Sequence, residues 1–179
     1  MNEIAFLEKC RTICAREGKN AIVRAVGHLA GIQWDINEYL NTRIEEPDEI
    51  TASLAKLRIS LGICMTWFRI DQYDLNKYLN GKVGGDRKRP LLDRYTEAYS
   101  GEQRNRDEPL KLFIRRCLAL FFLLKMFLQT GDTSRDALLQ VIGDLRLGEM
   151  ELICRFRLGC DEMEDRIDSL LGGGLLENK

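Results

Sequence analysis

Acidic side chains at helical spacing are the first residues of this sequence that could carry chemistry. Asp35 and Glu38 lie three positions apart, and on an α-helix this spacing places both carboxylates on one face. Asp144 and Glu151 lie seven positions apart, which also puts them on one side of a helix. Because Mg²⁺ prefers oxygen ligands, these four residues are the candidate metal ligands. The alternative is that all four belong to solvated helix faces.

A basic cluster lies near the middle of the chain, in a stretch that also holds two glycines and a proline. Its cations are Lys82, Arg87, Lys88 and Arg89. Such a cluster attracts phosphate groups or acidic protein surfaces by its charge. We therefore assign it as a candidate site for phosphate or for an acidic partner, with a solvated linker as the alternative.

Four further residues are candidates for lining a pocket, namely His28, Trp34, Lys56 and Trp67. The single histidine has no serine or cysteine nearby in the sequence that would complete a nucleophile and base pair, so no catalytic residue is assigned. Both tryptophans fall outside the main apolar stripes of their helices and would suit stacking on a base, with core packing as the alternative. Five of the six cysteines fall inside helical patterns and no secretory signal is recognised, so we expect free buried thiols, with disulfides as the alternative. The cysteine pairs lack histidine co-ligands, so we expect no zinc site.

Apolar residues recur at spacings of three and four along most of the chain, which is the pattern of amphipathic helices. Only three prolines interrupt this pattern. The predicted helices cover residues 2–17, 21–42, 49–70, 74–82, 91–99, 109–129 and 134–158, and a short last helix ends at the glycines 172–174. The sequence therefore predicts an all-α fold.

The apolar pattern repeats after a shift of 88 residues without gaps. Identical pairs fall in this register, among them Leu57-Arg58 with Leu145-Arg146. We divide the chain into two similar helical units, 1–89 and 90–179, within one integrated globular domain. One hairpin cannot bury both of its stripes alone. We therefore expect two tandem helical hairpin units packed as a four-helix-bundle-like core, with short flanking helices.

One carboxylate interrupts an apolar stripe of the second unit. An unpaired buried charge is costly, so we expect Glu149 to pair with Arg115, Arg116 or Lys56 inside the bundle. The alternative is that the apolar stripe ends at this position.

Composition limits the class of protein. A net charge of −1 and an apolar fraction of 45% suit a folded soluble chain and disfavour nucleic acid as a partner. The most apolar stretch, residues 117–128, is shorter than the roughly 20 residues of a membrane span, and the first residues do not form a signal-peptide pattern. We predict a cytoplasmic protein without membrane contact that forms a homo-oligomer or is a subunit of an assembly.

Residues 18–89 resemble the MazG-type all-α nucleoside triphosphate pyrophosphohydrolases, and residues 110–170 repeat the likeness weakly. The resemblance rests on helix lengths, on the apolar pattern and on Asp74-Leu75-Asn76-Lys77 with the basic residues after it. It implies an all-α fold. It also implies a Glu-x-x-Glu and a Glu-x-x-Asp motif on the two long helices, which hold Mg²⁺ for attack of water on the substrate.

The positions that match the family's metal ligands are His28, Gly31, Ser53 and Lys56, and none is acidic. In the second half, Asp144 alone keeps a carboxylate. The leading interpretation is a MazG-like helical protein, catalytically degenerate, that binds a nucleotide or a protein partner. One alternative is an active Mg²⁺-dependent pyrophosphohydrolase that uses the four candidate metal ligands. The other is a helical interaction subunit of a larger assembly.

Overall fold

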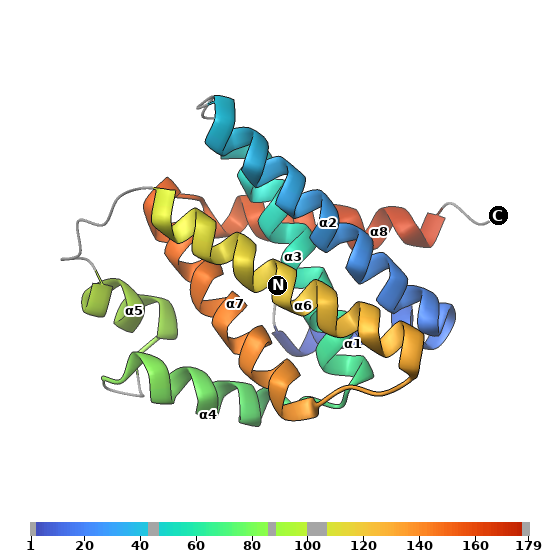
Figure 1. Cartoon of the computed structure of the whole chain (residues 1–179). Coiled ribbons are helices and arrows are strands. Elements are labelled where there is room, and N and C mark those ends of the chain that lie inside the picture. Colours follow the sequence, from blue (N-terminus) through green and yellow to red (C-terminus); the bar gives the residue numbers. More distant parts are fainter. Residues whose placement is uncertain (1–2, 43–46, 86–88, 100–106, 177–179) are drawn as a thin grey trace.

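The structure is a computed structural model that describes residues 3–42, 47–85, 89–99 and 107–176 (Figure 1). Every regular element in these ranges is an α-helix, which confirms the predicted fold class. The helices are α1 (Glu3–Glu17), α2 (Lys19–Thr42), α3 (Pro47–Trp67), α4 (Gln72–Val83), α5 (Leu91–Tyr99), α6 (Asp107–Thr130), α7 (Arg135–Phe156) and α8 (Cys160–Leu176). Only α8 differs clearly from its prediction, because it continues through the glycines 172–174. None of the described helices is long and apolar enough to span a membrane.

Four long helices form the core as two hairpins. α2 pairs with α3, α6 pairs with α7, and α2 packs against α6 and so joins the hairpins. The remaining helices flank this core, with α1 and α8 against α3 and with α4 and α5 against α7 (Figure 1). This arrangement is the predicted four-helix-bundle-like core with flanking helices.

The two halves repeat with one offset at every helix start. The first residues of corresponding helices are 3 and 91, 19 and 107, 47 and 135, and 72 and 160, so each pair is 88 residues apart. The ends of α3 and α7 also match, because Arg69 and Arg157 both adopt the left-handed conformation, at φ of 53° and 52°. The next amide, from Ile70 or Leu158, donates to the carbonyl five positions earlier at 2.9 and 3.1 Å. Both helices therefore end in the same type of C-terminal motif.

Each half packs its last helix against the other half. α4 follows α3 in the chain but lies against α7, whereas α8 follows α7 but lies against α3. Gly143 permits the first of these contacts, because a Cβ atom there would clash with the Tyr78 ring of α4. An ion pair of 2.7 Å joins Lys9 of α1 to Asp168 of α8 on the other side. The two halves are therefore interlocked around one shared core.

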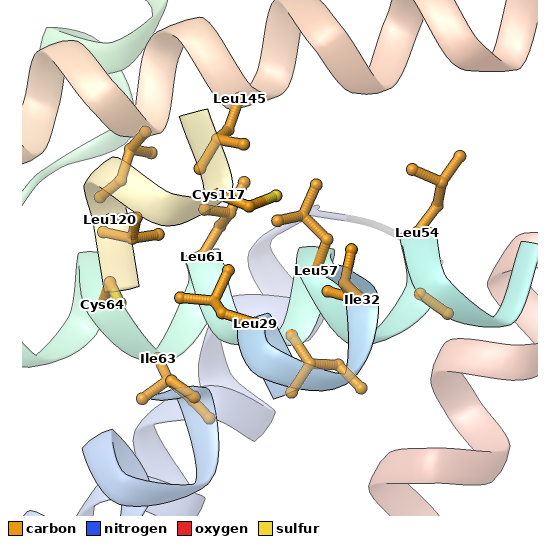
Figure 2. Packing of buried hydrophobic residues seen from close by; sticks show 14 of the residues in the cluster. Leu29, Ile32, Leu54, Leu57, Leu61, Ile63, Cys64, Cys117, Leu120 and Leu145 are labelled. Carbon is orange, nitrogen blue, oxygen red and sulfur yellow. The ribbon is translucent and has the colours of Figure 1, made fainter. Parts of the chain in front are cut away.

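The predicted apolar stripes are buried, and α3 is buried on nearly all sides. Leu29 of α2 and Cys117 of α6 lie in the centre and are fully buried (Figure 2). On α3, Leu57 and Ile63 point in different directions, yet both are fully buried. The reason is that α1, α2, α7 and α8 surround this helix. The single stripe predicted for α3 therefore underestimated how much of the helix is covered.

The described cysteine side chains are free thiols, as predicted. Cys10, Cys14, Cys64 and Cys117 are buried, and Cys154 is half-buried. Burial raises the pKa of Cys10 and of Cys117 to about 12. These thiols therefore stay protonated near neutral pH, and protonated thiols are poor nucleophiles.

Candidate functional site

A polar seam runs along the contact between α2 and α3, and it consists of His28, Asp35, Ser53, Lys56 and Ser60. Ser53 Oγ donates a hydrogen bond of 2.8 Å to Asp35 Oδ2, and Lys56 Nζ lies 3.5 Å from the same oxygen. About a third of each charged side chain is exposed, so solvent weakens this ion pair. Both partners nevertheless hold the Asp35 carboxylate against α3.

His28 lies further along the seam, and its imidazole contacts a buried serine of α3. Its Nδ1 is 3.3 Å from Ser60 Oγ, and the Ser60 hydroxyl donates to the Lys56 carbonyl at 2.8 Å. Because that hydroxyl has a single proton, the imidazole N–H is the donor to Ser60. Burial lowers the pKa of His28, and the positive charges of Arg24 and Lys56 lower it further. A neutral imidazole bonded to a fully buried serine is not placed to activate a nucleophile.

The polar seam does not form a metal site. Among the described residues, no group of three or more His, Cys, Asp or Glu side chains could hold a metal ion. The cavity beside Asp35, which Tyr39 and Glu49 also line, measures only about 10 Å³. A metal at Asp35 would also lie close to the Lys56 ammonium, and two like unit charges 4 Å apart repel by about 4 kcal/mol near a protein surface. The seam therefore favours internal pairing over Mg²⁺.

Two of the other predicted metal ligands, Asp144 and Glu151, lie on α7, which is not part of the polar seam. Asp144 accepts a hydrogen bond of 2.7 Å from the Tyr78 hydroxyl. Burial, and then this bond, raises the pKa of Tyr78 to about 12. Glu151 accepts from Arg155 one turn along α7 at 3.2 Å, and Glu38 is exposed on α2. The described residues therefore contain no cluster of these predicted carboxylates, and Asp144 is engaged by Tyr78 of α4 instead.

The basic cluster lies only partly within the described residues. Lys82 is exposed, and its ammonium lies 5.5 Å from the centroid of a tyrosine ring on the same helix. Arg89 forms an exposed ion pair of 2.6 Å with Glu97 of α5. Arg87 and Lys88 fall outside the described residues. The described part of the cluster therefore offers Lys82 as an exposed cation, whereas Arg89 is already paired.

The two tryptophans differ in exposure. Trp67 is half-buried and meets Phe127 edge-on, with ring centroids 6.4 Å apart. Trp34 is 73% exposed on α2. For both residues the alternative to a pocket role was packing in the interior. This alternative is correct for Trp67 and wrong for Trp34.

A buried charge cluster joins the two hairpins. Glu149 of α7 is fully buried, and its carboxylate accepts from Arg58 Nε of α3 at 2.8 Å and from Arg146 Nη1 of α7 at 2.5 Å. The expected pairing of this carboxylate is thus confirmed. The predicted partners were wrong, because the carboxylate is not paired with Arg115, Arg116 or Lys56.

The repeat contained the information needed to find the true partners. Arg58 and Arg146 occupy equivalent positions, whereas the counterpart of Glu149 is Leu61. The carboxylate therefore has no counterpart in the first half. It is bound by two equivalent arginines, one from each half. A cavity of about 50 Å³ adjoins the cluster, which is room for one or two water molecules.

Comparisons of the chain with protein-family models, curated proteins and solved structures gave no match.

Proposed function

We propose that the chain is a MazG-like helical protein that has lost metal-dependent hydrolysis and works by binding a protein partner. The observation that carries the proposal is the pairing on the polar seam. At two positions where the resembled family holds Mg²⁺, this chain has Ser53 and Lys56, and both engage Asp35. The Lys56 ammonium supplies positive charge where the metal ion would lie. Unlike a metal ion, it cannot coordinate phosphate oxygens or an attacking water.

Two features support a protein partner over a nucleotide. The cavities beside Asp35 and beside Glu149 measure about 10 and 50 Å³, whereas small-molecule sites usually measure about 300–1,000 Å³. In contrast, large apolar side chains such as Trp34 and Phe122 are more than half exposed on the long core helices. Exposed apolar surface of this kind is typical of protein interfaces.

Release of pyrophosphate from a panel of ribo- and deoxyribonucleoside triphosphates, with and without Mg²⁺, tests the loss of hydrolysis. We expect no release above the buffer rate. Release that requires Mg²⁺ and disappears in Asp35→Ala would overturn the proposal.

A thermal-shift measurement with the same nucleotides tests the choice of a protein partner. A ligand that binds only the folded state raises the melting temperature, and we expect no rise for any nucleotide. A rise without pyrophosphate release would identify the chain as a nucleotide-binding protein instead.

A further inference from the structure

α2 and α6 together form an outer face of the molecule, here called the α2/α6 face. Its residues are Val23, Gly27, Ala30 and Trp34 on α2 and Lys111, Arg115, Phe122, Lys125 and Met126 on α6, all of them exposed. The two helices pack against each other, with α3 beneath α2 and α7 beneath α6. They lie side by side and run in opposite directions (Figure 1). Side chains that point away from α3 and α7 therefore share one side of the molecule.

The α2/α6 face exposes four large apolar side chains. Trp34 is 73% exposed, Phe122 56%, Met126 55% and Val23 52%. Between the two apolar side chains of α2 lies Gly27, where an added Cβ atom would meet no other atom within 4 Å. The face therefore has large apolar side chains around open space, and such a surface accommodates side chains of a partner.

The unpaired cations of the α2/α6 face lie on one helix. Arg115 and Lys125 form no ion pair with any described residue, whereas Lys111 is weakly paired with Glu108 at 3.7 Å. The two unpaired cations are ten residues apart on α6, which corresponds to about 15 Å along the helix axis. On α2, Arg24 is paired with Glu17 at 2.6 Å, and the exposed carboxylate of Glu38 lies one turn beyond Trp34, at the position equivalent to Met126. A complementary surface is therefore apolar in its centre and carries carboxylates at two points about 15 Å apart.

We infer that the α2/α6 face binds an amphipathic helix of another protein, with an apolar stripe that covers Trp34 and Phe122 and with acidic residues that pair with Arg115 and Lys125. Carboxylates ten or eleven positions apart on a helix have the required separation and lie on the same side as a stripe at positions i, i+4 and i+7. This inference specifies the partner of the proposed function and rests on it.

The charges disfavour two other occupants. A second copy that docked through the same face would bring two further unpaired cations and only one further exposed carboxylate, Glu38, so positive charge would be in excess across the interface and repulsive. Nucleic-acid binding usually relies on many phosphate contacts, whereas this face offers two unpaired cations in a chain of net charge −1.

Two fluorescein-labelled helical peptides of about 18 residues with the same leucine stripe provide the test. One carries glutamate at its polar positions and the other carries lysine. We expect the acidic peptide to bind and to shift the Trp34 emission of a Trp67→Phe protein to shorter wavelength, because the ring leaves water. We expect Trp34→Ala and Arg115→Glu each to weaken binding at least about tenfold.

Matched controls lie on α4, which is away from the α2/α6 face. Tyr73 is 74% exposed and Lys77 is also exposed, so Tyr73→Ala and Lys77→Glu repeat the same kinds of change elsewhere. We expect both controls to bind the acidic peptide as the parent does. Equal effects at the two places would overturn the inference, because the peptide would then respond to overall charge.

Other outcomes also contradict the inference. Equal binding of the two peptides, or binding of neither, would remove the acidic helix as occupant. A dimer mass in light scattering that Trp34→Ala abolishes would assign the face to a second copy. Competition by a single-stranded oligonucleotide that Arg115→Glu abolishes would assign it to nucleic acid. None of these experiments measures pyrophosphate release, so failure of the inference is distinguishable from failure of the proposed loss of hydrolysis.

Discussion

Replacement of Glu149 by leucine removes the one carboxylate that two arginines share at the junction of the hairpins. Leucine is the appropriate replacement, because Leu61 occupies the equivalent position of the first half and is buried there. In the variant, Arg58 and Arg146 keep their positive charges but lose the group that accepts from both. We expect a less stable protein with the same fold.

The size of the effect follows from the burial of the three side chains. Removing one partner of a buried ion pair costs about 3–5 kcal/mol, because the remaining charge is left without compensation. The side chains of Arg58 and Arg146 are 23% and 20% exposed, so water can solvate part of each guanidinium. We therefore expect a loss near the lower end, about 3 kcal/mol in the free energy of unfolding. For a chain of this length that is a decrease of about 6–12 °C in the melting temperature.

Urea unfolding followed by circular dichroism measures this loss. Glu97→Leu is the control, because Glu97 is an exposed partner of Arg89, and its loss should cost less than about 1 kcal/mol. A triple variant with Arg58→Met, Glu149→Leu and Arg146→Met should recover most of the stability, because apolar side chains of similar size often replace a buried charge cluster without loss. A Glu149→Leu protein as stable as the parent would refute the reasoning.

Two further predictions concern groups whose pKa values the fold shifts. The folded state lowers the pKa of His28, so the unfolded chain takes up its proton first and stability falls as the pH drops below about 6.5. His28→Gln should reduce this fall in urea unfolding between about pH 7 and pH 5, and an unchanged slope would contradict the assignment. Burial raises the pKa of Cys10, Cys64 and Cys117, so iodoacetamide should label half-buried Cys154 before these three. Early labelling of Cys64, detected by mass spectrometry, would show that the core opens.

The sequence was sufficient for the helices but not for their side-chain partners. The apolar stripes that contain Leu29 on α2 and Cys117 on α6 are local patterns, since spacing alone decides which side of a helix is apolar. The exposure of Trp34 depends on whether another element covers the outer side of α2. The bond between Tyr78 and Asp144 depends on α4 crossing to the other half, which helix length and apolar spacing do not encode.

The interlocked repeat accounts for the differences between the halves. α4 packs on α7 and α8 on α3, and α3 and α7 also contact each other at the junction of the halves. At this junction one carboxylate, Glu149, pairs with an arginine from each half. The same division holds on the outer face, where Trp34 and Phe122 occupy equivalent positions but the unpaired cations lie on α6 alone. The first half thus keeps the internally paired polar seam, and the second half supplies the charges that distinguish an acidic partner from other apolar helices.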